Sequence, residues 1–289
     1  MLRLLSRVAV VLWAAVAAGQ AAAPGGHLVL IGGGEKPPEV MRKFVELAGG
    51  PAAPIVAIPT ASSEPDTGAY YVRLFKEEYS CTDVVSLEIR SPADARRPEY
   101  VELASRARGI FFSGGDQVRI LTALARSPVL AAISAAFARG AVVGGTSAGT
   151  ACQSPLMITG EGDFSGIRSR SVELWDGLGF FSGVIVDQHF IARQRQNRLF
   201  AAILEHPEYL GVGIDEDTAV WVRPDGTFEV LGRSSVMVVD ASTAKLGRQP
   251  RDTGQDGLGA HGVTVHVLLP GEVFDLKTRS VFGPTTGVN

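Results

Sequence analysis

The stretch AVVGGTSAG, residues 141–149, limits the fold of this chain more strongly than any other. It predicts a short apolar strand that enters a Gly-x-Ser-x-Gly turn, with a helix-compatible stretch (TACQSPLMI) after it. A turn of this kind lifts a serine hydroxyl clear of a sheet, and the flanking glycines leave room that a Cβ atom would fill. Ser147 is therefore a candidate nucleophile. A plain Gly-rich turn that packs tightly or holds an anion at a helix N-terminus would show the same pattern.

Strands and helices alternate through the first half of the sequence. Apolar runs predict strands at residues 27–31, 55–58, 83–87 and 110–112, and helical spacing predicts helices at residues 39–47, 70–79, 99–106, 118–124 and 129–138. This alternation implies right-handed βαβ crossovers and an α/β fold, a doubly wound and mostly parallel sheet flanked by helices. Ligands of such sheets bind beyond the carboxyl ends of the strands.

The second half of the sequence predicts a different pattern. An irregular stretch after Gly160 precedes strands at 184–186 and 211–214, with a helix at 198–204 between them. Segments 219–222, 227–231, 235–239 and 263–269 predict antiparallel hairpins that extend one edge of the sheet toward the C-terminus. The polar, Gly-rich stretch 241–262 is expected to be a mobile surface loop. With no internal repeat, residues 24–289 are expected to form a single α/β domain.

The first 23 residues differ in kind from the rest. Arg3 and Arg7 precede an apolar run at 8–18, and small residues follow it. This pattern predicts a secretory signal peptide, with an uncleaved N-terminal anchor as the alternative. We therefore expect a secreted or periplasmic protein that has no membrane association once the signal is removed.

Charge and composition exclude several classes of protein. Without residues 1–23, 25 basic and 30 acidic residues remain, so the formal charge changes from −3 to −5. The sequence has no basic stripe for a nucleic acid, and no spacing of His, Cys or carboxylates that would supply a metal site, so neither metal nor cofactor is expected. Cys81 and Cys152 are expected to be small core residues rather than a bridge or a reactive thiol. The oligomeric state is left open, a homodimer included.

Polar residues follow several of the predicted strands and should meet at one face of the sheet. A serine needs a base within hydrogen-bond reach, and His189 is the best of the five histidines because it alone follows an apolar strand among polar neighbours. Glu216 follows the next strand and is the favoured acid to orient that base. Asp187 is expected to turn toward the substrate. The competing acids are Asp187, Asp217, Glu161 and Asp163.

Backbone amides near Ser147 could stabilise an oxyanion. The N–H groups of Ala148, directly after the nucleophile, and of Gly115, in SGGDQ, are the candidates. Arg193, Arg195 and Arg198 form one basic cluster, suited to two-point recognition of carboxylates. A solvated helix start is the weaker alternative, because positive charge at a helix N-terminus opposes the macrodipole.

Five segments together resemble the cyanophycinases, which are serine exopeptidases of the family that also contains aspartyl dipeptidase. They are GGTSAG (144–149), SGGDQ (113–117), DQHFIARQRQNRL (187–199), GVGIDEDTA (211–219) and PTASS (59–63). The resemblance runs from about residue 27 to residue 239 and implies a fold like class I glutamine amidotransferases. Thr150 departs from it, since alanine often follows GTSAG in the family.

The resemblance implies a role for each matching residue. Ser147 is then the nucleophile, His189 the base and Glu216 the acid, in an order unlike that of α/β-hydrolases. The pocket residues that it implies are Gln117, Asp187, Gln188, Arg193, Arg195 and Arg198. The implied substrate is cyanophycin, a polyaspartate with arginine joined to each side chain, released as β-aspartyl-arginine dipeptides. Cleavage of other β-aspartyl or short α-aspartyl peptides, or a secreted binding protein with an inactive site, are the alternatives.

Overall fold

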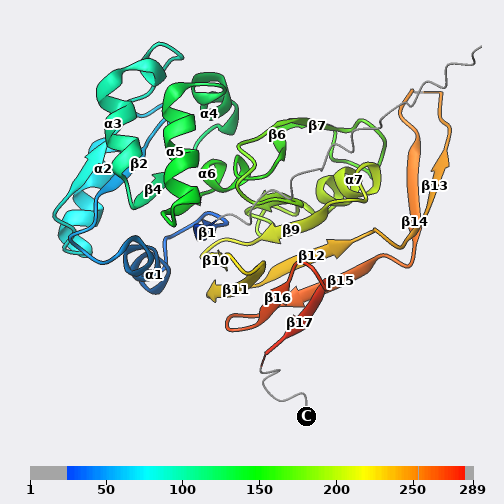
Figure 1. Ribbon diagram of the computed structural model, residues 1–289. Coiled ribbons are helices and arrows are strands. Elements are labelled where there is room, and N and C mark those ends of the chain that lie inside the picture. The colour runs from blue at the N-terminus through cyan, green and yellow to red at the C-terminus, as the bar shows by residue number, and fades with distance from the viewer. Residues whose placement is uncertain (1–24, 253, 284–289) are drawn as a thin grey trace, which may run out of the picture.

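The computed structural model describes residues 25–252 and 254–283 (Figure 1). The expected signal peptide lies outside the described residues. A nine-stranded sheet has the strand order β17-β16-β11-β10-β1-β5-β4-β2-β3, and a four-stranded sheet has the order β15-β12-β9-β8. Two two-stranded hairpins, β6-β7 and β13-β14, complete the strands.

The parallel half of the large sheet confirms the fold class predicted from the alternation. Its neighbouring strands are all parallel: β1 (Leu28–Ile31), β5 (Val142–Thr146), β4 (Gly109–Phe112), β2 (Ile55–Ile58) and β3 (Val84–Ser86). Four of these strands are buried along their whole length. Both faces of a parallel sheet are covered, which is why these strands are continuous apolar runs in the sequence.

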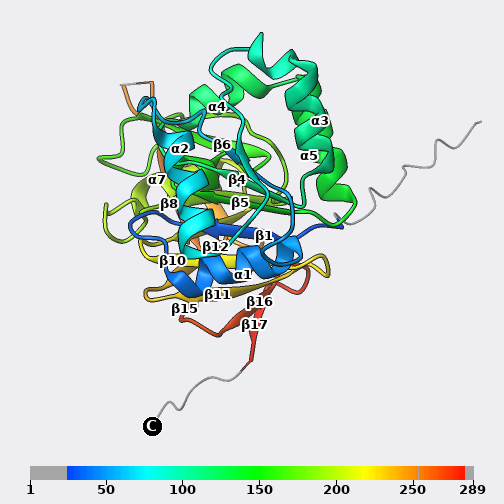
Figure 2. The same ribbon diagram turned by 90° about the vertical axis from the view of Figure 1, so that its left-hand side faces the viewer.

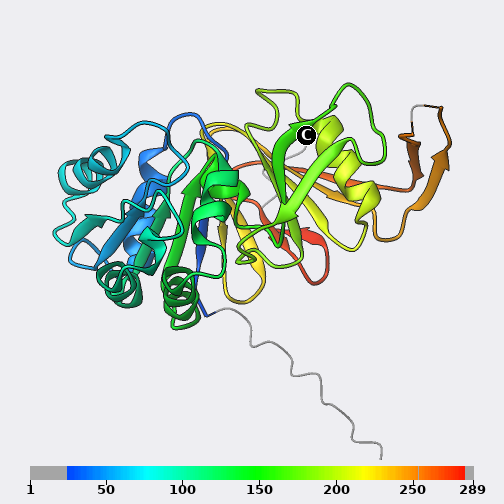
Figure 3. The ribbon, with the colours of Figure 1, turned by 90° about the horizontal axis from the view of Figure 1, so that it is seen from above.

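Helices cover both faces of this sheet (Figures 2 and 3). The first face packs against α1 (Pro38–Ala48) and α2 (Thr67–Arg73), and the second against α3 (Pro98–Arg106), α4 (Gln117–Leu124) and α5 (Pro128–Ala138). Asp116 and Ser127 cap α4 and α5 by accepting bonds from Val118 N (2.8 Å) and Leu130 N (3.1 Å). The helix expected at 70–79 is divided, because α2 continues as a π-helical turn, Leu74–Glu78. A 3₁₀ turn, Asp94–Arg96, precedes α3.

The antiparallel extension is also present. It consists of β10 (Thr218–Val222), β11 (Thr227–Gly232), β16 (Val273–Asp275) and β17 (Ser280–Phe282), and β10 pairs with β1. Not all the later strands join it. A second sheet contains β8 (Val184–Gln188), β9 (Leu210–Ile214), β12 (Val236–Asp240) and β15 (Thr264–Leu268), with α7 (Gln196–Glu205) packed on it.

Three local expectations were wrong. The stretch after Gly149 forms only one helical turn, α6 (Ala148–Ala151), and then turns at Pro155 into strand β6 (Leu156–Gly162). The stretch after Gly160 continues into a hairpin with β7 (Val172–Asp176). Residues 241–262, expected to be a surface loop, instead contain a hairpin, since β13 (Lys245–Gln249) and β14 (Gly257–His261) pair across five positions at the edge of the molecule (Figure 1).

Cys81 and Cys152 are both buried and unpaired, as expected. Among residues 25–252 and 254–283, no single helix is long and apolar enough to cross a membrane. Helices α4 and α5 together have that length and composition, but they meet at a bend of 102°.

Candidate active site

Ser147 stands on a strained turn between β5 and α6. Its φ is 53° and its ψ is −114°, a backbone conformation that residues other than glycine rarely adopt. A Cβ atom at Gly145 would lie 2.2 Å from the carbonyl oxygen of Gly149, so only glycine fits the narrow turn. The hydroxyl of Thr150 lies 2.7 Å from Ile31 O and 2.9 Å from Gly145 O. The Thr150 hydroxyl therefore connects the turn to strand β1 by hydrogen bonding.

Ser147, His189 and Glu216 form one hydrogen-bonded triad. His189 Nε2 lies 2.8 Å from Ser147 Oγ, and His189 Nδ1 lies 2.5 Å from Glu216 Oε1. His189 follows β8 and Glu216 follows β9, so the parallel pair β8-β9 of the second sheet brings base and acid to the end of β5 in the first. A neutral imidazole in this position accepts the serine proton while the carboxylate fixes its orientation.

The glycine turn after β1 shapes the space around the histidine. The N–H of His189 donates to Gly32 O (2.6 Å), and a Cβ atom on Gly33 would lie 2.1 Å from Cε1 of the imidazole ring. Gly33 has a φ of 120°. No role for this turn was predicted from the sequence. Its only signal was three successive glycines after a buried strand, at the sheet edge where ligands bind.

Burial is the main influence on the charge of His189, whose side chain is 8% exposed. It lowers the pKa of His189 below the ordinary value, the hydrogen bond to Glu216 raises that pKa, and the charge of Arg193 lowers it again. The net pKa is lowered, so the imidazole is neutral near pH 7 and can act as a base.

The two aspartates beside Glu216 fix the loops around the triad by accepting backbone hydrogen bonds. Asp215 Oδ1 accepts bonds from Ile191 N (3.0 Å) and Ala192 N (2.9 Å), which fixes the loop after His189. Asp217 Oδ1 accepts from Glu35 N (2.7 Å) and so binds the glycine turn. Neither carboxylate bonds to the imidazole.

Two further candidate acids, Glu161 and Asp163, lie on the β6-β7 hairpin. Asp163 forms an ion pair with Arg168 at 2.7 Å. Glu161 lines a pocket of about 480 Å³ beside Ser147. Among the acids weighed from the sequence, Glu216 is therefore the one bonded to His189 in this structure.

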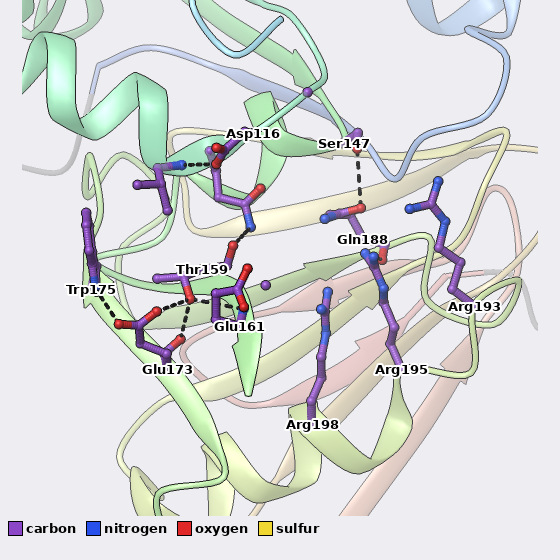
Figure 4. Close-up of a pocket in the computed structure, with 14 residues that line it drawn as sticks. Asp116, Ser147, Thr159, Glu161, Glu173, Trp175, Gln188, Arg193, Arg195 and Arg198 are labelled. Carbon is purple, nitrogen blue, oxygen red and sulfur yellow. Dashed lines mark hydrogen bonds between the residues drawn. The ribbon is translucent and has the colours of Figure 1, made fainter. Parts of the chain in front are cut away.

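The pocket beside Ser147 has two walls of opposite charge (Figure 4). Strands β6 and β7 supply Glu161, Glu173 and Trp175, and the segment 193–198 supplies the arginines. Glu173 is held in place by Thr159 Oγ1 (2.9 Å) and by Trp175 Nε1 (3.3 Å). Neither Glu173 nor Trp175 was predicted as a pocket residue, because their segment was expected to be irregular.

The three arginines all line this pocket but differ in their contacts. Arg198 is 4% exposed and bonds to Asp187 through two nitrogens, Nε lying 2.6 Å from Asp187 Oδ2. Asp187 is 1% exposed, so the expectation that it turns toward the substrate was wrong. Arg195 donates to the carbonyl oxygen of Gln188 (2.7 Å). Arg193 is half exposed, 3.9 Å from Glu216 Oε1.

Arg195 is charged, but no carboxylate in the described part of the chain lies close to it. Its nearest one, Asp187 Oδ1, is 3.9 Å away and is already bonded to Arg198. Burial, reinforced by the neighbouring charge of Arg198, lowers the pKa of Arg195 to about 10, which leaves the guanidinium protonated at neutral pH. This group is therefore available to an anion that enters the pocket.

The two glutamines expected in the pocket lie on either side of it. Gln188 Oε1 is 3.4 Å from Ser147 Oγ. Gln117 is 6% exposed, and its side-chain nitrogen donates to Ile158 O (2.9 Å) and Thr159 O (2.6 Å). Gln117 thus fixes the β6 wall against α4.

The expected oxyanion donors also lie around Ser147. Gly115 lines the pocket with a φ of 136°, and a Cβ atom there would lie 2.2 Å from Ala61 O. Within the described part of the sequence, the N–H groups of Gly115 and Ala148 have no backbone acceptor. In the same ranges, no group of three or more His, Cys, Asp or Glu side chains is placed to hold a metal ion.

Comparison with known proteins identifies the family of this chain. Residues 28–230 match peptidase family S51. A cyanophycinase of Synechococcus elongatus is 38% identical over 261 residues, which cover 89% of this chain and 81% of that protein. A cyanophycinase of Geminocystis herdmanii is 35% identical over 266 residues, which cover 90% of this chain and 96% of that protein.

A solved structure supports the fold. The crystal structure of a peptidase from an acI-B1 Actinobacterium superposes with a TM-score of 0.62 at 24% identity, covering 86% of this chain and 98% of that protein. The family match spans most of the sequence, and serine, histidine and carboxylate stand in one hydrogen-bonded triad. The chain belongs to peptidase family S51 and is a serine peptidase.

Proposed function

We propose that this protein is an exported exopeptidase that hydrolyses cyanophycin to β-aspartyl-arginine dipeptides through an acyl-enzyme at Ser147. The observation that carries the proposal is the pocket beside Ser147, with arginines on one wall and carboxylates on the other. A β-aspartyl-arginine unit carries both a guanidinium and carboxylates, so a pocket of both signs suits it. Relatives named cyanophycinase, 35–38% identical over most of the sequence, support the same substrate.

The reaction follows from the hydrogen-bonded triad. Ser147 Oγ attacks the carbonyl carbon while His189 Nε2 takes the hydroxyl proton and Glu216 stabilises the imidazolium. Gly115 and Ala148 donate N–H bonds to the oxyanion. The amide bond then breaks, His189 gives its proton to the leaving nitrogen, and the acyl group stays on Ser147. A water activated by His189 releases it.

The two walls of the pocket bind different groups of the substrate. Glu161 and Glu173 pair with the substrate guanidinium, and the indole of Trp175 offers a face for cation–π stacking. Arg193 and Arg195 bind the substrate carboxylates, and Gln188 contacts the reacting group beside Ser147. Buried Asp187 and Arg198 support this wall, and Gln117 supports the opposite one.

The experiment that tests this function is release of soluble product from insoluble cyanophycin. The purified mature protein should release β-aspartyl-arginine, identified by mass spectrometry, and Glu173→Gln should slow the release about tenfold or more, because a charge-assisted contact is lost. Cleavage of short α-aspartyl peptides with the polymer left intact would assign an aspartyl dipeptidase activity instead.

Glu216→Gln should retain measurable activity. The orienting acid contributes less than the nucleophile, and we expect a loss of about 10²- to 10⁴-fold in kcat. The carboxylate also raises the pKa of His189, so the acidic limb of the pH profile should shift to lower pH in this variant. Wild-type turnover in Glu216→Gln would show that Glu216 is not the acid that orients His189.

Gly33→Ala should lower turnover without a comparable loss of stability. The new methyl group would lie 2.1 Å from the His189 ring and must displace it from Ser147. We expect at least a 10²-fold fall in kcat for a shift of about 1 Å. Gly50→Ala is the matched control, since Gly50 also has a positive φ, 93°, but an added Cβ atom there has no described atom within 4 Å. Equal activity loss in both variants would show that backbone strain alone is responsible.

Export is part of the proposal and has its own test. The N-terminal sequence of protein recovered from outside the cytoplasm should begin near residue 24, with Arg3 and Arg7 removed. A full-length N-terminus on membrane-bound protein would favour an uncleaved anchor.

A further inference from the structure

A second hollow lies on the other side of Ser147. It has a volume of about 290 Å³ and shares Ser147 with the charged pocket, but its far wall consists of Lys36, Thr67, Tyr70 and Tyr71. These residues come from the segment after β1 and from α2, whereas the charged pocket is lined by the β6-β7 hairpin. None of them has a part in the mechanism above.

Lys36 gives this hollow its charge. Its ammonium lies 5.4 Å from the ring centre of Tyr70 and 5.6 Å from that of Tyr71. Of the described residues that line the hollow, Lys36 is the only lysine or arginine, and none is a carboxylate. No Asp or Glu oxygen in the described ranges lies within 4.0 Å of its Nζ. Two aromatic rings thus position a cation that has no anionic partner among the described residues.

His189 shows which part of a substrate this hollow receives. The imidazole lines the second hollow and does not line the charged pocket. In the step that breaks the amide bond, His189 Nε2 must give its proton to the leaving nitrogen, so the leaving amine lies on the histidine side of Ser147. The acyl part of the substrate then occupies the charged pocket, and the leaving part occupies the second hollow.

We propose that the second hollow is the leaving-group subsite, in which Lys36 Nζ binds the backbone α-carboxylate of a C-terminal residue. This inference rests on the proposed peptidase function. That α-carboxylate is separated from the leaving nitrogen by a single carbon, so it is the anion of the leaving unit that a small hollow next to Ser147 can reach. Lys36 then makes the enzyme remove one unit at a time from a free C-terminal end.

The test compares two substrates that differ only in this group. A two-unit β-aspartyl-arginine substrate is prepared with its terminal backbone α-carboxyl group free or as an amide, and kcat/KM is measured for each. The wild type should prefer the free carboxylate about tenfold or more, as expected for a charge-assisted contact. Lys36→Met should lower kcat/KM for the free acid by a similar factor and leave the amide unchanged, which removes the preference. Lys36→Arg should keep most of the preference for the free acid.

Two controls separate a lost contact from a damaged site. Lys43→Met is the matched variant, because Lys43 Nζ also lies over an aromatic ring, 4.8 Å from that of Trp221, but outside both hollows. It should retain the wild-type preference. Hydrolysis of a small activated ester whose leaving group has no carboxylate should be the same in Lys36→Met as in the wild type.

Two results would overturn the inference. Equal cleavage of acid and amide by the wild type would mean that no terminal carboxylate is recognised. An equal loss on acid, amide and ester in Lys36→Met would mean that Lys36 supports the fold or the triad. If the polymer proves not to be the substrate, the same acid and amide pair is made from the aspartyl peptide that is cleaved. Failure of the cyanophycin assignment can then be distinguished from failure of the Lys36 subsite.

Discussion

Ser147→Ala should abolish peptide hydrolysis, with kcat falling by about 10³- to 10⁶-fold. The variant lacks the hydroxyl bonded to His189 Nε2, so no acyl-enzyme can form. The free energy of unfolding should change little, because the backbone of residue 147 keeps its bond to Ile31 O (3.0 Å) and alanine is close to serine in size. Product release by mass spectrometry and chemical denaturation measure the two quantities.

The control for this prediction is Ser169→Ala. Ser169 is a buried serine that lines neither hollow beside Ser147, and its hydroxyl accepts a bond from Asp256 N (2.9 Å). It should retain most of the activity. Substantial turnover in Ser147→Ala would show that another group is the nucleophile.

Arg198→Met should lower the free energy of unfolding by about 3–5 kcal/mol, because it leaves the carboxylate of Asp187 buried without its partner. Both members of the pair are almost fully buried, at 4% and 1% exposure, so solvent does not screen the loss. Chemical denaturation measures this change. Activity on every substrate should fall together, since Asp187 and Gln188 both lie on the strand that leads to His189.

Arg195→Met provides the contrast. Among residues 25–252 and 254–283, the carboxylate closest to Arg195 is that of Asp187, at 3.9 Å, so the loss of Arg195 leaves no charge newly unpaired at close range. Its stability should remain near that of the wild type, while cleavage of cyanophycin falls about tenfold or more and hydrolysis of a small ester changes little. Equal stability in the two variants would mean that the Asp187 ion pair does not support the fold.

The parallel half of the fold could be predicted from sequence because its signal is local. Each of its strands is a short apolar run closed by glycine or polar residues, and each helix has its own spacing. The second sheet could not be predicted in the same way. Strands β9 and β12 pair across 22 residues or more, Ile214 with Val236, and nothing in an alternating pattern says which of two sheets a strand joins.

The residues of the site show the same difference between features with a local sequence signal and features without one. Ser147, His189 and Glu216 each follow an apolar strand, and their residue types limit the chemistry, so their meeting could be predicted from sequence. Contacts made across the fold carried no such signal. Gly33 against His189 and Lys36 beside two tyrosines join segments that are separated in the sequence, and only packing brings them together.

The central claim is that His189 activates Ser147 as a nucleophile, and a fluorophosphonate tests it most directly because it forms a stable ester with an activated serine. The protein is treated with the reagent, digested and mapped by mass spectrometry. We expect one modified site, Ser147, with labelling lost in Ser147→Ala and strongly slowed in His189→Ala. Modification of a different residue, or labelling of Ser147 at the wild-type rate without His189, would contradict the claim.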